Sequence, residues 1–237
     1  MLVRSLLTSL AVMISACGGN PQTLHAFEIS SDVASSGDEL RNALFQTVGA
    51  TMAPGHTVTR LDNGAVFDTL VSDIEHAKTS IDIVMYIWET GAASTRVAAA
   101  LVAKAKSGVA CRIVIDSVGS PHFGKQVSPA LERAGCLVRV FRPFPANSAL
   151  LRNHRKIAVF DGVVAIMGGF GIRDEWLGDG VSRGGWRDTN VRFTGPAVRD
   201  AHQAFAENWQ EAGGKLLAAP SFPAQPTDGT MHVAFVF

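Results

Sequence analysis

The sequence predicts an α/β fold in which helices and strands alternate along a mostly parallel sheet. Residues 65–78 carry apolar side chains at helical spacing, and residues 81–88 form an apolar run rich in β-branched and aromatic residues. The first pattern is typical of an amphipathic helix and the second of a strand buried on both faces. The same alternation recurs at residues 92–115 and 128–141, so we expect right-handed crossovers between neighbouring parallel strands.

The elements of the first half follow in chain order. A short helix is expected at residues 38–48. Residues 57–61 alternate as a strand and end at the turn Asp62-Asn63-Gly64. A helix at residues 92–106 ends before Gly108, at a position where glycine often provides a left-handed cap.

The later elements include a hairpin, treated separately below. The others are, in order, a strand at 112–115, a helix at 128–134, a strand at 137–141, a strand at 186–193 and a helix at 196–212. Gly135 ends the helix before it. Pro196 suits a first helical turn, because the N–H that it lacks would have no partner there.

The hairpin carries the most informative side chains at its mouth. Two short β-rich runs, 157–160 and 163–167, flank Asp161-Gly162, a strong hairpin signal. His154 and Lys156 lie two residues apart, so on an extended strand their side chains leave the same face. Such a pair suits a phosphate: the imidazole can attack phosphorus or move a proton, and the lysine can hold the anionic oxygens.

The spacing His-x-Lys-x4-Asp-x6-Gly-Gly resembles the HKD motif of the phospholipase D superfamily. Its members here are His154, Lys156, Asp161, Gly168 and Gly169. The flanks, Asn153 and Asp174-Glu175-Trp176, resemble the bacterial cardiolipin synthase-like branch. The likeness extends over about residues 58–210 and implies an α/β/α sandwich around a mixed, mostly parallel sheet, a phospholipase D-like half.

The resemblance implies roles for three catalytic residues. His154 would be the nucleophile, and Lys156 would neutralise the non-bridging oxygens of the phosphate. An imidazole attacks well when its other nitrogen donates to a fixed acceptor; Asp188 is the candidate for that carboxylate. A surface ion pair with Arg187 or Arg192 is the alternative role for Asp188.

The other motif residues are predicted to support this site. Asp161 completes the motif and begins the turn, and we interpret its role as structural. Gly168 and Gly169 would let the backbone approach the phosphate closely, and Asn153 would support the histidine. One position departs from the family pattern. Relatives usually carry an Asn that interacts with the phosphate or with a lysine, and this chain has Gly171 there.

The larger departure is that the chain contains one HKD motif. Catalysis in the superfamily is a two-histidine ping-pong, in which one His forms a phosphohistidine and the other protonates the leaving alcohol and activates the acceptor. We therefore expect a truncated two-motif enzyme that lacks its carboxyl-terminal half, a homodimer like the small nucleases of the superfamily, or an inactive binding module. We favour truncation, because residues 231–237 resemble an unpaired first strand of a second half.

Composition limits the partners. Apolar residues make up 47% of the 237 residues and the formal net charge is zero, whereas nucleic-acid-binding proteins usually carry a basic excess. No nucleic-acid partner is expected. Residues 119–125 resemble most of a Walker A loop, but Gln126 replaces the required Ser or Thr, so nucleotide hydrolysis is disfavoured. No HExxH or CxxC pair occurs, and we predict neither a metal nor another cofactor.

The amino terminus indicates export. Residues 1–17 have the pattern of a lipoprotein-type signal peptide, and Ile14-Ser15-Ala16-Cys17 resembles a bacterial lipobox with Cys17 as the lipidated residue. The alternative is an ordinary cleavable signal. We expect a tether and capping segment at 18–54, the phospholipase D-like domain at 55–214, and a linker with the start of a missing second half at 215–237.

The expected protein is therefore a phospholipase D-like phosphodiesterase or phosphatidyltransferase, lipid-anchored on the periplasmic face of the bacterial cell envelope. Its expected substrate is phospholipid. Cys111 and Cys136 would then face an oxidising compartment. A disulfide between them is one alternative, but we favour two buried free thiols, because adjacent parallel strands rarely place two Cβ atoms correctly.

Overall fold

A computed structural model describes residues 36–143, 151–182 and 184–236. The chain divides into two units, residues 1–49 and 50–237. In the first unit, helix α1 (Gly37–Val48) is the helix expected at 38–48, and Gly49 caps it with a left-handed φ of 68°. The signal peptide, Cys17 and residues 18–35 lie outside the described residues.

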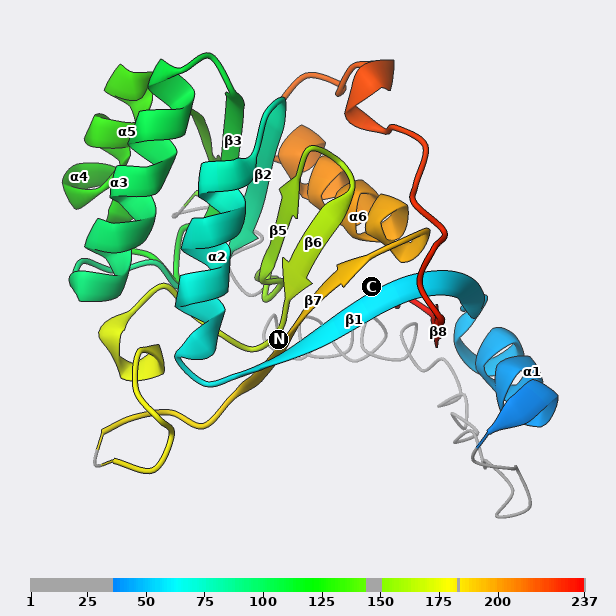
Figure 1. The fold of residues 1–237 in the computed structure, drawn as a ribbon. Helices are drawn as coiled ribbons and strands as arrows, with labels where there is room; N and C mark the ends of the chain where they lie inside the picture. The colour runs from blue at the N-terminus through cyan, green and yellow to red at the C-terminus, as the bar shows by residue number, and fades with distance from the viewer. Residues whose placement is uncertain (1–35, 144–150, 183, 237) are drawn as a thin grey trace, which may run out of the picture. The chain divides into compact units, whose positions relative to one another are not determined.

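The second unit is built on a sheet with strand order β4-β3-β2-β5-β6-β7-β1-β8 (Figure 1). The strands are β1 (Ala53–Asp62), β2 (Ser80–Met85), β3 (Ala110–Asp116), β4 (Leu137–Phe141), β5 (Ile157–Phe160), β6 (Val164–Met167), β7 (Thr189–Thr194) and β8 (Met231–Val233). The helices are α2 (Ala65–His76), α3 (Ala92–Lys106), α4 (Phe123–Gln126), α5 (Ser128–Ala134) and α6 (Ala197–Glu211), with short 3₁₀ turns η2 (Asp174–Trp176) and η3 (Ala219–Ser221).

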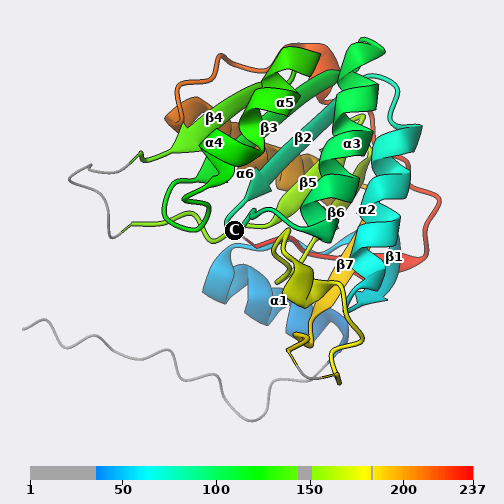
Figure 2. The same ribbon diagram turned by 90° about the vertical axis from the view of Figure 1, so that its left-hand side faces the viewer.

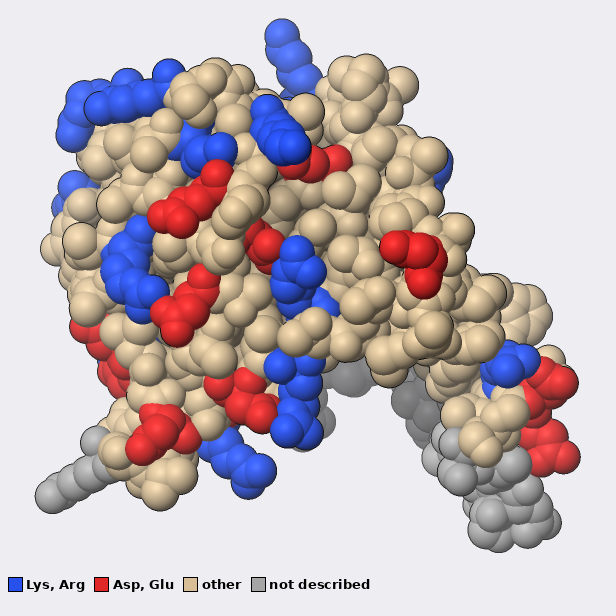
Figure 3. All heavy atoms as spheres, viewed as in Figure 1, with Lys and Arg blue, Asp and Glu red and all other residues tan. Residues whose placement is uncertain are grey.

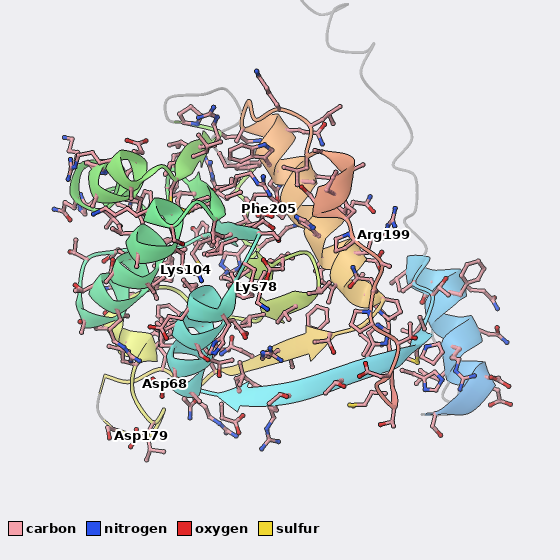
Figure 4. All side chains as sticks on the ribbon, turned by 45° about the horizontal axis from the view of Figure 1, so that its top comes forward. Asp68, Lys78, Lys104, Asp179, Arg199 and Phe205 are labelled. Atoms are coloured by element: carbon pink, nitrogen blue, oxygen red, sulfur yellow. A yellow bond between two sulfur atoms is a disulfide. The ribbon has the colours of Figure 1, made fainter. Side chains whose placement is uncertain are left out.

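Helices cover both faces of this sheet, which confirms the α/β/α sandwich. Helices α2, α3 and α5 lie on one face and α6 on the other (Figures 1 and 2). Strand β2 has apolar side chains on both faces, so each face needs a cover. Ile83 packs into the core under α2 and α3, whereas its neighbour Val84 packs into the core under α6. Phe205 of α6, fully buried, belongs to that second core (Figure 4).

The sheet is mixed, as expected, but it is not mostly parallel. Among the described strands only β2–β3 and β3–β4 are parallel, and the other pairings are antiparallel. The reason lies in the connections. A parallel pair needs a long crossover, which α3 and the α4–α5 segment supply, whereas the tight turn between β5 and β6 can join only antiparallel strands.

Strand β8 differs from its expected role. We expected residues 231–237 to open a second half as an unpaired strand. Instead, β8 pairs antiparallel with β1, with Met231 opposite His56 and Val233 opposite Ala53. The strand thus forms an edge of this sheet, and the argument from an unpaired strand no longer supports truncation.

The prediction of two free thiols was wrong. Cys111 and Cys136 form a disulfide with Cα atoms 4.6 Å apart. The strand register explains the geometry: Arg112 lies opposite Leu137 at the start of the parallel β3–β4 pair. The two cysteines therefore face each other one position earlier, where Cys136 has not yet entered the regular ladder.

Candidate active site

The hairpin register places the histidine beside the end of β2. Ile157 of β5 pairs with Val84 of the antiparallel strand β2, so the residues before Ile157 run alongside the residues after Met85. The His154 ring accordingly packs on Tyr86, with ring centroids 4.5 Å apart. The site therefore lies where β2 ends and β5 begins.

His154 and Lys156 contact each other directly. The Lys156 Nζ lies 2.8 Å from Nδ1 of His154 and 2.7 Å from its backbone oxygen. The same ammonium lies 5.1 Å from the centre of the Tyr86 ring, within range of a cation–π interaction. Lys156 is 4% exposed, whereas His154 is exposed. The imidazole can thus reach a ligand from a position fixed by buried groups.

The protonation of both side chains is shifted towards the neutral forms. Burial lowers the pKa of Lys156 to about 8, against the opposing effect of the Asp188 carboxylate. Burial, followed by the Lys156 charge, lowers the pKa of His154, and Asp116 opposes that shift. Near neutral pH the site therefore holds a neutral imidazole beside a charged ammonium.

Asp188 does not form the predicted hydrogen bond with His154 among the described residues. Its carboxylate instead accepts from Nε1 of Trp176 at 3.2 Å and from the amide of Thr189 at 2.8 Å. Asp188 still acts on the site through its charge, which opposes the fall in the pKa of Lys156. The alternative ion pair with Arg192 is not formed either, because that guanidinium binds Asp73.

The side chains of neighbouring residues leave little space for a Cβ at Gly168 or Gly169. A Cβ on Gly168 would stand 2.0 Å from Oδ1 of Asn190, and one on Gly169 would stand 2.6 Å from Oδ1 of Asp188. Asn190 is fully buried and accepts from the amide of Phe170. The glycines thus let β7 approach the mouth of the hairpin, a role that the sequence did not indicate.

Asn153, predicted to support the histidine, is 6% exposed and hydrogen-bonded to its surroundings. Its backbone N–H donates to Oδ2 of Asp116 at 3.0 Å, and its side-chain Oδ1 accepts from the backbone N–H of Arg155. Asp116 ends β3, is 1% exposed and also accepts from Arg152 and from the amides of Val118 and Gly119. This carboxylate anchors the segment that carries His154.

Asp161 lies at the opposite end of the hairpin from His154. It adopts a left-handed φ of 52° and accepts hydrogen bonds from the amides of Lys78, Thr79 and Ser80. Burial alone would raise the pKa of Asp161, but these hydrogen bonds together lower it. The contacts fit the structural interpretation rather than a catalytic one.

A side chain at Gly171, such as the Asn of the family pattern, would press on its apolar neighbours. A Cβ here would stand 3.0 Å from Cβ of Ile87 and 3.2 Å from Cζ3 of Trp176. The departure from the family pattern is therefore accompanied by tight apolar packing around this position.

Four residues around the site were not singled out as site residues from the sequence: Tyr86, Asp116, Trp176 and Asn190. A signal existed for two of them. Tyr86 and Asp116 come at or just after the carboxyl ends of neighbouring parallel strands, where functional groups of α/β sheets gather. The contacts of Trp176 and Asn190 depend on β7 and η2, whose approach to the hairpin no local pattern revealed.

Within the described ranges, no group of three or more His, Cys, Asp or Glu residues could hold a metal ion. An exposed neutral imidazole with an adjacent ammonium suits nucleophilic or proton-transfer chemistry on an anionic ester.

Among the residues that the structure describes, no helix has the length and apolarity needed to cross a membrane.

Comparison with protein families gives one matching domain. Residues 70–180 match the family described as cardiolipin synthase, PLD-like domain. The chain is 38% identical over 154 residues to the cardiolipin synthase of Oceanobacillus iheyensis, which covers 64% of this chain and 32% of that protein. It is 39% identical over 150 residues to the major cardiolipin synthase of Bacillus subtilis, covering 62% and 31%. The chain thus spans about a third of the length of these relatives.

Solved structures share the fold at low identity. Nuc from Salmonella typhimurium, a phospholipase D family member, matches with a TM-score of 0.51 and 21% identity over 68% of this chain and 99% of that one. NucT from Helicobacter pylori matches with a TM-score of 0.54 and 15% identity, again over 68% and 99%. The phosphatidylserine synthase of Haemophilus influenzae matches with a TM-score of 0.54 and 12% identity over 72% and 40%.

Proposed function

We propose that this chain, whose residues 70–180 form a phospholipase D-like domain of the cardiolipin synthase family, provides one half of a phosphatidyltransferase or phosphodiesterase active site that acts on phospholipid. The main support for this proposal is the exposed His154 ring, whose Nδ1 lies 2.8 Å from the Nζ of the buried Lys156. The relatives at 37–39% identity are named cardiolipin synthases, and this supports a phospholipid substrate.

In the proposed reaction, a ring nitrogen of His154 bonds to phosphorus while the bond from phosphorus to the headgroup oxygen breaks. The leaving oxygen takes a proton from the histidine of a second half. That histidine then removes a proton from an acceptor alcohol or water, whose oxygen attacks phosphorus as the P–N bond breaks. Lys156 stabilises the charge on the non-bridging oxygens throughout.

The geometry adds one condition to this scheme. A charged ammonium can only donate, so while Lys156 faces Nδ1 of His154, that nitrogen accepts and the ring proton resides on Nε2. For Nε2 to attack, Lys156 must turn to the phosphate and Nδ1 must carry the proton. We infer that an anionic substrate favours this exchange, because it offers the ammonium a stronger partner than a neutral imidazole.

The second half must come from outside this single motif. A second copy of the chain or a missing carboxyl-terminal half would supply the second histidine. About two thirds of this chain covers Nuc and NucT almost completely. The fold therefore occurs in chains shorter than this one, which supports a second copy as a source.

The test is the release of glycerol from phosphatidylglycerol by the purified chain. We expect release that His154→Ala abolishes and Lys156→Met reduces by several orders of magnitude. His232→Ala, an exposed histidine on the edge strand β8, is the matched control and should leave release unchanged. Glycerol release by His154→Ala at the unmodified rate would refute the proposal.

A homodimeric endonuclease is the second candidate. The match to Nuc and NucT, which this chain covers almost completely, favours it. The zero net charge does not, and Figure 3 shows acidic and basic side chains interspersed rather than a basic surface on the face in view. Hydrolysis of DNA that is lost in His154→Ala, without glycerol release from lipid, would replace the lipid proposal.

We further propose that the protein is exported and lipid-anchored at Cys17. The lipobox-like sequence at 14–17 supports the anchor. The Cys111–Cys136 disulfide supports an oxidising compartment. Mass spectrometry of the protein from a bacterial membrane fraction tests this: a diacylglyceryl group on an amino-terminal Cys17 is expected, and an unmodified amino terminus would exclude it.

A further inference from the structure

A pocket lies at the end of the sheet away from His154. It has a volume of about 320 Å³, and Arg112, Leu137, Arg139, Trp209, Lys215 and Leu216 are among its lining residues. Arg112 stands four residues before Asp116 on β3, a distance of about 13 Å along the strand. Asp116 is the residue that anchors the His154 segment. We call this the edge pocket; it contains neither His154 nor Lys156.

The edge pocket is cationic. Its lining includes Arg112, Arg139 and Lys215 and no acidic residue. Arg112 is already neutralised, because it forms a bidentate ion pair with the buried carboxylate of Asp82. The charges of Arg139 and Lys215 have no carboxylate partner within the lining, so the pocket is complementary to an anion.

Trp209 contacts both residues that carry these two charges. The Arg139 guanidinium lies over the Trp209 ring, 5.5 Å from its centre. Nε1 of Trp209 donates to the backbone oxygen of Lys215 at 2.9 Å. Gly214 makes this approach feasible, since a Cβ there would stand 2.2 Å from the indole. The buried indole of α6 thus fixes both the cation on β4 and the loop that carries the other.

The rest of the pocket is apolar and open to the surface. Leu137 is 52% exposed and Leu216 is 78% exposed. The buried Trp209 and the partly buried Leu217 also line it. Exposed leucines beside cations suit a ligand with an anionic and an apolar part.

We propose that the edge pocket binds an anionic phospholipid, with its phosphate at Arg139 and Lys215 and its acyl chains over Leu137 and Leu216. This goes beyond the proposed function, because the site is separate from the catalytic histidine and needs no second half. A volume of this size lies at the lower end of small-molecule sites and suits a phosphoglycerol headgroup with the start of its chains.

The experiment uses the full chain and dihexanoylphosphatidylglycerol below its micelle concentration. Binding is followed by the indole N–H signal of Trp209 in NMR spectra. We expect saturable binding that Arg139→Gln/Lys215→Gln weakens by about tenfold or more, since charged hydrogen bonds are lost. The control Arg199→Gln/Lys125→Gln removes the same charge from exposed positions and should leave the affinity unchanged. Arg199 lies ten residues before Trp209 on α6 (Figure 4).

Three further arms decide the result. His154→Ala should bind with unchanged affinity, so a loss of binding in that variant would place the lipid in the catalytic site and overturn the proposal. Equal binding of glycerol 1-phosphate would reduce the pocket to an anion site, and equal binding of dihexanoylphosphatidylcholine would reduce it to an apolar one. Failure of glycerol release alone would count against the proposed reaction and leave this binding result intact.

Discussion

At the scale of single residues, His154 and Lys156 set each other's protonation. The Lys156 charge lowers the pKa of His154, in addition to the effect of burial. We therefore expect His154 to titrate below 6.5 and Lys156→Met to raise its pKa, as measured by ¹H–¹⁵N NMR of the ring nitrogens. An unchanged pKa in Lys156→Met would contradict the direct contact.

The same two shifts predict the pH dependence of catalysis. The imidazole must be neutral to attack, which requires a pH above the lowered pKa of His154. The lysine must be charged, which requires a pH below about 8. Headgroup release should therefore rise through the His154 pKa, level off near neutrality and fall above pH 8. A rate that stays constant to pH 10 would exclude a role for the Lys156 charge.

Gly168 offers a test of how the motif glycine works. We expect Gly168→Ala to lower the free energy of unfolding by about 1–3 kcal/mol, because the new methyl group would overlap the buried Asn190 side chain. Gly124→Ala is the control, since a Cβ there meets open space. The urea concentration at half unfolding measures the stability of both variants. Equal values for Gly168→Ala and Gly124→Ala would show that β7 shifts to accommodate the methyl group with no loss of stability.

At the scale of elements, the disulfide joins the amino ends of β3 and β4 around the crossover. It closes a loop of 25 residues, which by the chain-entropy account stabilises the fold by about 3.5 kcal/mol. Cys111→Ser/Cys136→Ser should lose stability of this order, and reduction of the natural protein should reproduce the loss. If thermal unfolding of the oxidised and reduced proteins coincides, the bond does not form in solution.

The boundaries of the elements near the site show how well local sequence patterns predict where helices and strands begin and end. The expected helices at 92–106 and 128–134 agree with α3 and α5, and the hairpin runs agree with β5 and nearly with β6. These segments have regular periodicity and clear glycine ends. The strand expected at 186–193 begins only at Thr189, because the residues before it leave the ladder to contact η2 through Trp186.

At the scale of the whole molecule, His154 alone cannot complete the two-histidine reaction that we propose. If a second copy completes the site, each active assembly needs two intact subunits. Mixing the natural chain with His154→Ala, with subunit exchange, should make activity fall as the square of the intact fraction. A linear fall would mean that each subunit works alone, and light scattering of the same mixtures would report the assembly state.

The sequence by itself predicted the helices other than α4, the hairpin with Asp161 at its turn, and the pairing of an imidazole with an ammonium. These depend on spacing and on turn chemistry within a few residues. Tertiary structure decided the strand directions, the Cys111–Cys136 bond and the partners of Asp188. Each of these depends on register between strands distant in sequence, and a local pattern carries no information about that register.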